Sequence, residues 1–166
     1  MRLRRVGPEE AEPLRELRLR ALREDPGAFA ETFEEGRARP LGEWASWAAD
    51  DSRVIVVAIV GERWVGMVAC RLLDEASTWL TALWVDPVVR GTGLGVRLIE
   101  AAAGWARERG RATIELSVTT NNTAAAALYA RAGFTETGRR RPLPADPSRT
   151  EVFLRRPVSP ARPRGR

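Results

Sequence analysis

The sequence predicts an α/β fold: a mixed, mostly antiparallel seven-stranded sheet with helices on both faces. The chain has 166 residues and is 44% hydrophobic, which suits one compact domain with one substantial core. Three β-rich runs follow one another between Val54 and Val85 with short breaks, a pattern typical of an antiparallel meander. Beyond Asp86 the pattern changes to glycine turn, helix and strand, which indicates a parallel crossover.

The first third of the chain is predicted to be mainly helical. Arg2 to Val6 alternates in hydrophobicity and predicts a short strand. Pro8 then opens an amphipathic helix that runs to Leu22, and the turn Asp25-Pro26-Gly27 ends it. Residues 28–49 predict two shorter helices.

The middle of the chain predicts three sequential strands. Val54 to Val60 and Trp64 to Leu73 are β-rich, and Gly61-Glu62-Arg63 between them indicates a hairpin. After a break at Asp74-Glu75, Thr78 to Val85 forms the third strand. These runs therefore predict neighbouring antiparallel strands.

The last part of the chain predicts two helices and three strands. The helix from Leu94 to Gly110 leads into the strand Thr113 to Val118, so this strand should lie parallel to the one before the helix. Asn121 to Arg131 has helical spacing. Phe134 to Gly138 and Thr150 to Arg155 predict two final strands around a proline-rich loop.

Composition excludes several kinds of chemistry. The chain has no histidine, so Ser-His, Cys-His and histidine-ligated zinc sites are excluded. Cys70 is the single cysteine, which leaves no disulfide framework and no cysteine-rich metal site. We therefore expect no metal, and proton transfer must use carboxylates, Tyr129 or water.

The net charge of +5 comes from the C-terminal end. Residues 155–166 hold five arginines and no acid, so the rest of the chain is balanced. We expect one domain over residues 1–155 and an Arg/Pro-rich tail over residues 156–166. The neutral body argues against nucleic acid as a partner.

Neither a secretory leader nor a membrane span is predicted. The basic N-terminus has no apolar stretch behind it, and the longest apolar run, Val54 to Val60, is too short to cross a bilayer. We therefore expect a cytoplasmic protein without membrane contact.

The segment Arg90-Gly91-Thr92-Gly93-Leu94-Gly95 lies between a predicted strand and helix, which favours a phosphate ligand at the exposed amides. A P-loop would need a lysine, and the chain has none. A dinucleotide fold would need Gly-x-Gly-x-x-Gly after its first strand. A turn that uses glycine only for backbone freedom remains an alternative.

With this glycine-rich segment and the helix that follows the next strand, the chain resembles the GNAT superfamily of acetyl-CoA-dependent N-acetyltransferases. The resemblance spans Leu83 to Phe134. Leu-Trp-Val-Asp-Pro followed by Arg90-x-x-Gly93-x-Gly95 is similar to the pyrophosphate signature of that superfamily, and Asn122-x-x-Ala125-x-x-Leu128-Tyr129 is similar to its later helical motif. The resemblance implies that the parallel strands splay apart and form the acyl-CoA cleft.

The resemblance also implies residue roles. Tyr129 would be the general acid that protonates the leaving thiolate, although a core aromatic is an alternative. Asn122 would contact the cofactor arm or simply cap its helix. The strand Thr78 to Val85 lacks the glutamate that many relatives carry. Glu31, Glu34 and Glu35, Glu115 through water, and loss of the proton to solvent therefore remain open as routes for the base. The implied cofactor-binding residues are Leu83, Trp84, Val85, Arg90, Gly91, Thr92, Gly93, Leu94, Gly95, Val96, Arg97 and Asn122.

The predicted function is transfer of an acetyl group from acetyl-CoA, or another short acyl-CoA, to a primary amine by direct attack. The acceptor is a small-molecule amine or a peptide N-terminus, and a homodimer is possible. A non-catalytic acyl-CoA-binding module and a protein N-terminal acetyltransferase are the alternatives. An excess of acids over arginines in residues 1–51 hints at a cationic acceptor. Candidate acceptor-binding residues are Phe29, Glu31, Phe33, Glu34 and Trp84.

Overall fold

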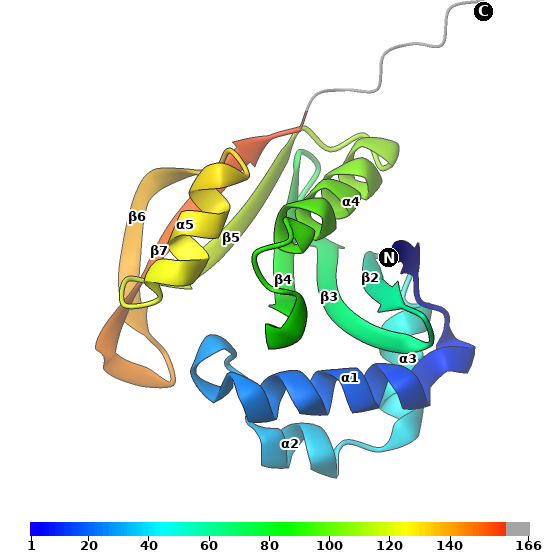
Figure 1. The fold of residues 1–166 in the computed structure, drawn as a ribbon. Coiled ribbons are helices and arrows are strands. Elements are labelled where there is room, and N and C mark those ends of the chain that lie inside the picture. Colours follow the sequence, from blue (N-terminus) through cyan, green and yellow to red (C-terminus); the bar gives the residue numbers. More distant parts are fainter. Residues whose placement is uncertain (159–166) are drawn as a thin grey trace, which may run out of the picture.

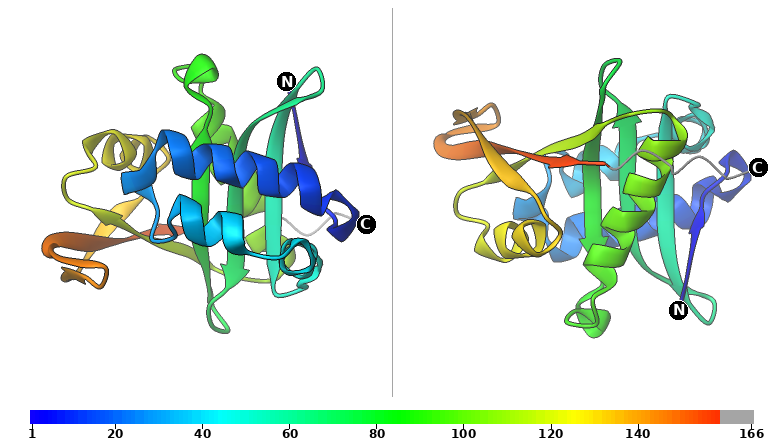
Figure 2. Two further views of the ribbon diagram at one scale, coloured as in Figure 1. Left: turned by 90° about the horizontal axis from the view of Figure 1, so that it is seen from below. Right: turned by 90° about the horizontal axis from the view of Figure 1, so that it is seen from above.

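The computed structural model describes residues 1–158 and consists of one sheet with helices on both faces (Figures 1 and 2). The seven strands lie in the order β1-β2-β3-β4-β5-β7-β6, and only β4 and β5 pair in parallel. The predicted fold class is therefore confirmed. The strands are β1 (Arg2–Arg5), β2 (Arg53–Val60), β3 (Arg63–Leu72), β4 (Ser77–Val85), β5 (Thr113–Thr119), β6 (Thr135–Leu143) and β7 (Asp146–Pro157).

The helices form two layers. One layer covers the face formed by β2 and β3, and the other packs across β2 to β5 on the opposite face (Figure 2). The first layer contains α1 (Ala11–Glu24), α2 (Phe33–Ala38) and α3 (Leu41–Ala49), and the second contains α4 (Leu94–Glu108) and α5 (Thr123–Arg131). Short 3₁₀ turns are η1 (Pro8–Glu10), η2 (Pro26–Ala28) and η3 (Pro87–Val89).

Each face of the sheet has its own hydrophobic core. On one face, Leu14 and Leu17 of α1 and Trp44 of α3 are almost fully buried against β2 and β3. On the other face, Leu98 and Ile99 of α4 are fully buried against the central strands. Burial of these side chains holds both helical layers on the sheet.

A bulge in β4 changes which face its residues meet. The β3–β4 register moves from Ala69 opposite Thr81 to Met67 opposite Trp84, so β4 contains one extra residue there. Within this bulge Ala82 has φ of 55°, a backbone conformation rare for a residue with a Cβ. The bulge places Leu83 against the core beneath α4 and Trp84 in the core beneath α1 and α3.

The parallel strands separate soon after they meet. Pairing of β4 with β5 is confined to Ser77–Trp79 opposite Thr113–Glu115, although both strands continue. Figure 1 shows the two strands diverging from this point. Backbone groups on the facing edges of β4 and β5 beyond the pairing lack the sheet partner that the other strand would supply.

Several element ends differ from those predicted. Strands β6 and β7 extend through most of the predicted proline-rich loop and leave a turn at residues 144–145. Pro142 fits because β6 is an edge strand, where a missing N–H need not break a ladder. The last helix begins at Thr123 rather than Asn121.

The predicted tail overlaps the last strand. Arg156 and Pro157 belong to β7, and Val158 is buried with its N–H donating to the carbonyl of Ala112 at 2.7 Å. Residues 159–166 lie outside the described part of the chain. Within residues 1–158, no helix combines the length and apolar character that a bilayer crossing requires.

Candidate functional site

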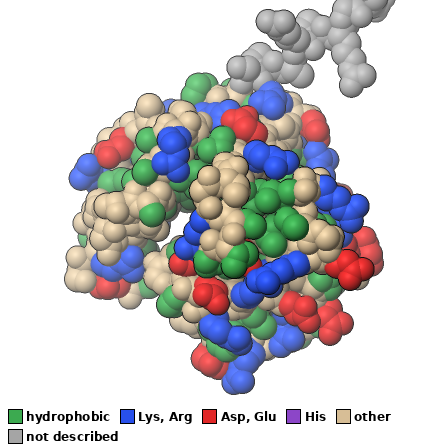
Figure 3. Space-filling model, in the orientation of Figure 1, with side chains coloured by type: hydrophobic (Ala, Val, Ile, Leu, Met, Phe, Trp, Pro, Cys, Tyr) green, Lys and Arg blue, Asp and Glu red, His purple; other side chains and the backbone are tan. Residues whose placement is uncertain are grey.

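A cavity of about 770 Å³ lies where β4 and β5 diverge. Leu83 of β4, Ser117 of β5 and Tyr129 of α5 line it from the sheet and the second helical layer. Phe29 and Glu31, from the loop between η2 and α2, line it from the first layer. Figure 3 shows an opening through the molecule in this view, between the half that carries α5 and the half that carries α4. The cavity is therefore open to solvent.

The glycine loop presents a row of free amides at the start of α4, and α5 connects this loop to the cavity. The first main-chain bond of α4 is donated by Arg97 to the carbonyl of Gly93 at 3.2 Å, and within residues 1–158 the N–H groups of residues 91–96 have no acceptor. Gly91 and Gly93 make this possible with φ of 77° and 81°. These amides and the dipole of α4 form a site suited to an anion such as a phosphate.

The other residues of the loop have packing roles. Leu94, the first residue of α4, is buried in the core, and the Oγ1 of Thr92 donates to the carbonyl of Val89 at 2.7 Å. A Cβ added at Gly95 would lie 2.9 Å from Cδ2 of Leu128 on α5. The absence of a side chain at Gly95 therefore lets α5 approach the start of α4.

Arg90 and Trp84 converge on one carboxylate. The Nη2 of Arg90 lies 2.5 Å from Oδ2 of Asp25, and the Nε1 of Trp84 donates to the same oxygen at 2.7 Å. The Nε of Arg90 donates to the carbonyl of Val85 at 2.9 Å. The Arg90 guanidinium therefore ties the glycine loop to the end of α1, and the Trp84 side chain is buried outside the cavity lining. Arg97 is exposed.

Tyr129 lines the cavity and is half-buried. Its ring packs edge-on against Phe134, with ring centroids 5.7 Å apart. Its hydroxyl bonds no other group within residues 1–158, so it is free to bond a molecule in the cavity. Burial raises the pKa of Tyr129 to about 12, because desolvation disfavours the phenolate. The phenol therefore keeps its proton at neutral pH and can act as a hydrogen-bond donor.

Asn122 both caps α5 and lines the cavity. Its Oδ1 accepts from the N–H of Ala125 at 3.2 Å, the N-cap bond that one reading of the sequence expected. The amide nitrogen of the same side chain remains available to a ligand.

Only some of the predicted acceptor-binding residues lie together in the cavity. Phe29 and Glu31 line the cavity, whereas Phe33 and Glu34 lie outside its lining. Arg23 stacks on Phe33 at 4.8 Å, and Glu34 pairs with Arg37 at 3.0 Å, so both side chains act within the helical layer.

Among the candidate bases, Glu31 alone lines the cavity. Its carboxylate pairs with Arg18 at 3.1 Å and also with Arg39. Glu35 forms the capping box of α2 with Thr32. Glu115 lies outside the lining and pairs with Arg155 at 2.8 Å.

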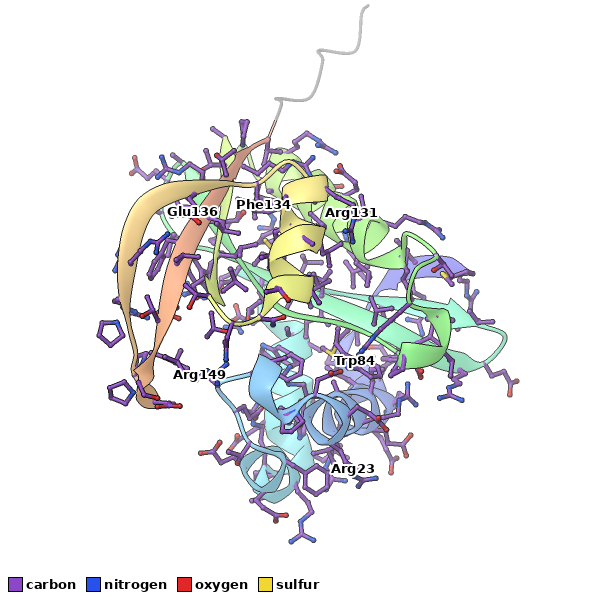
Figure 4. The ribbon with its side chains drawn as sticks, turned by 60° about the vertical axis from the view of Figure 1, so that its left-hand side comes forward. Arg23, Trp84, Arg131, Phe134, Glu136 and Arg149 are labelled. Carbon is purple, nitrogen blue, oxygen red and sulfur yellow. The ribbon has the colours of Figure 1, made fainter. Side chains whose placement is uncertain are left out.

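Sequence reasoning missed most of the polar lining. These residues come from α1, α3, β2 and β4, from the C-cap of α2 and from the β6–β7 hairpin, so no local motif marks them. Figure 4 shows Arg149 lying between that hairpin and the loop after α1, where its Nη2 donates to the carbonyl of Gly27 at 3.4 Å. The missed residues include Arg18, Arg39, Trp47, Arg53, Trp79, Arg141, Arg149 and Glu151.

Two curated proteins are similar in sequence. The mycothiol acetyltransferase of Beutenbergia cavernae is 34% identical over 140 residues, which cover 81% of this chain and 45% of that protein. The [ribosomal protein bS18]-alanine N-acetyltransferase of Escherichia coli strain K12 is 39% identical over 84 residues, which cover 50% of this chain and 55% of that protein. The chain thus spans about half the length of the curated relatives it matches.

Solved structures share the fold. The yncA protein of Salmonella typhimurium, solved with its cofactor acetyl-CoA, superposes with a TM-score of 0.77 at 17% identity and covers 99% of this chain and 98% of that one. Residues 12–134 match the Acetyltransferase (GNAT) family. The matched segment covers most of the chain, from the first residues of α1 to the end of the motif on α5, and the chain belongs to the GNAT acetyltransferase family.

Proposed function

We propose that this acetyltransferase binds acetyl-CoA and transfers its acetyl group to a primary amine by direct attack, without a covalent enzyme intermediate. The observation that carries the proposal is the cavity at the divergence of β4 and β5, with Tyr129 in its lining. Helix α5 joins this cavity to the glycine loop, because Leu128 packs on Gly95 while Tyr129 lines the cavity.

The free amides of residues 91–96 would hold the pyrophosphate at the start of α4. Edge groups of β4 near Leu83 and Val85 would bond the pantetheine arm, because β5 has already diverged there. Arg90 would keep the loop in place through Asp25. Its guanidinium is then a positioning group rather than a free charge for the phosphates.

In the proposed step the amine nitrogen bonds to the thioester carbonyl carbon, and collapse of the tetrahedral intermediate breaks the C–S bond. The leaving thiolate takes a proton from the Tyr129 hydroxyl, and the former amine loses one to solvent or Glu31. The raised pKa keeps the phenol protonated before the step but makes loss of its proton harder, so the hydroxyl must be hydrogen-bonded to the sulfur as the thiolate forms. Water would reprotonate Tyr129 through the open cavity.

Binding and turnover test the proposal separately. Thermal unfolding with acetyl-CoA at a hundredfold excess over Kd should show stabilisation of about 2.7 kcal/mol, with NAD and ATP as controls. Release of CoA should then depend on added amine, including a peptide with an N-terminal alanine. Stabilisation without amine-dependent release would favour a non-catalytic binding module, and no stabilisation would refute the proposal.

A further inference from the structure

The cavity lining is richer in positive than in negative charge. Five arginines and three carboxylates line it, and each carboxylate already has partners. Glu31 is shared by two arginines, Glu151 pairs with Arg141, and Asp146 accepts from the backbone and hydroxyl of Ser148 at 3.2 and 2.6 Å. A cationic acceptor would therefore find no uncommitted carboxylate in the described lining. The excess of acids in residues 1–51 suggested a cationic acceptor, whereas the positive charge of the cavity lining favours an anionic one.

Arg18 is the most deeply buried of these arginines. Its side chain is 9% exposed and its guanidinium lies 4.3 Å from the ring centroid of Phe29. The Nε pairs with Glu31 at 3.1 Å, but the Nη1 is buried and has no acceptor within residues 1–158. A charged donor that is buried without an acceptor is costly, so a ligand that supplies one is favoured.

The counter-charge for Arg18 is incomplete. Its carboxylate partner, Glu31, is shared with Arg39, which also has Glu43 at 3.8 Å. Arg149, which also lines the cavity, donates to neutral oxygens of Thr119, Asn121 and Gly27, and its Nε is buried without an acceptor within residues 1–158. Arg18 and Arg149 therefore both have a donor and a charge to offer an anion.

We propose that the acceptor is an amine that also carries an anionic group, a carboxylate or a phosphate, and that Arg18 binds this group with support from Arg149. The proposal rests on the proposed acetyltransferase function and specifies its substrate class. Guanidinium is the side-chain group best matched to both anions. The same positive charges disfavour an ammonium group nearby, and so favour the neutral amine that can attack the thioester.

Matched probes test the charge preference without turnover. Calorimetry on the CoA-saturated protein would compare β-alanine with propylamine and phosphoethanolamine with ethanolamine, with spermidine as a polycation. We expect the anionic member of at least one pair to bind about tenfold tighter or more than its partner. The pair with the larger ratio identifies carboxylate or phosphate as the anion.

Arginine variants assign the preference to a place in the cavity. Arg18→Met should reduce the ratio to about threefold or less, because a side chain of similar length lacks the donors. Arg149→Met should reduce it as well and serves as the test if Arg18→Met does not fold. Arg131→Gln on the exposed side of α5, outside the lining, should leave the ratio unchanged.

Equal affinities within both pairs, no binding by any anionic probe, or tightest binding by spermidine would overturn the proposal. So would an unchanged ratio in folded Arg18→Met. If the proposed acetyltransferase function itself were wrong, acetyl-CoA would fail to bind. The acceptor probes therefore test the substrate class, and acetyl-CoA tests the proposed function.

Discussion

The two sides of the cavity differ in how their residues are spread along the chain. The side with Leu83 and Tyr129, which α5 connects to the glycine loop, comes from one continuous stretch that includes β4, α4, β5 and α5. The side with Arg18, Arg39 and Arg149 is assembled from α1, the end of α2 and the start of β7. The first, called the continuous side below, can be recognised in the sequence as spaced motifs. The second, called the assembled side, forms only when the chain folds.

The chemistry assigned to the continuous side depends most on Tyr129. Tyr129→Phe removes the hydroxyl and leaves the ring to pack on Phe134, so turnover should fall about a hundredfold or more while acetyl-CoA affinity holds. Steady-state kinetics with calorimetry measures both. Phe134→Leu disturbs the same packing but keeps the hydroxyl, and should have the smaller effect on turnover. Unchanged turnover in Tyr129→Phe would remove the general-acid role.

The assembled side depends on Glu31 for its framework. Glu31→Gln leaves Arg18 without a carboxylate and Arg39 with Glu43 alone, at 3.8 Å, so the unfolding free energy should fall by about 2 kcal/mol, less than for a fully buried pair. Acetyl-CoA affinity should not change, since Glu31 lies on the other side. Denaturant unfolding and calorimetry check the two expectations. A large loss of acetyl-CoA affinity would show that the two sides are coupled.

The sequence predicted the order of the strands and helices because hydrophobic spacing and glycine turns act locally. It missed the ends of β6 and β7, where Pro142 and Pro144 suggested a loop, because the position of an edge strand depends on the whole sheet. It also could not show that Arg90 pairs with Asp25, since nothing near Arg90 in the sequence reveals this partner. The arginines of the cavity have no periodic pattern and could not have been selected from 27 in the chain.

Because Tyr129 is the single tyrosine, its pKa can be measured directly and reports how far the continuous side is shielded from water. The pKa of Tyr129 should be about 12 in the folded protein and about 10 when unfolded, because burial disfavours the phenolate. The folded form holds the proton more tightly, so its stability is complete below about pH 10 and declines as the pH rises toward 12. Phenolate absorbance during a pH titration reports the pKa. Titration near 10 in the folded protein would place the hydroxyl in water.

A substitution in the glycine loop should have a smaller effect, and this effect should be on acetyl-CoA affinity. Gly93→Val places a β-branched residue at φ of 81° on the N-cap of α4, so acetyl-CoA affinity should fall about tenfold as the amides shift. Calorimetry measures the loss. Gly104→Ala, within the same helix, should leave affinity unchanged and add up to about 1 kcal/mol of stability. Unchanged affinity in Gly93→Val would move the phosphate site away from this loop.

The smallest effect is expected at the C-terminal end, which belongs to neither side of the cavity. A chain that stops after Val158 keeps the buried Val158 side chain and the bond from its N–H to Ala112. Its unfolding free energy should therefore differ by less than about 0.5 kcal/mol, and its acetyl-CoA affinity should be unchanged. Removing residues 159–166 also removes three arginines, so any binding to nucleic acid that depends on them should decline. If acetyl-CoA binding declined instead, the tail would have to contribute to the cofactor side, and that side would no longer be one continuous stretch.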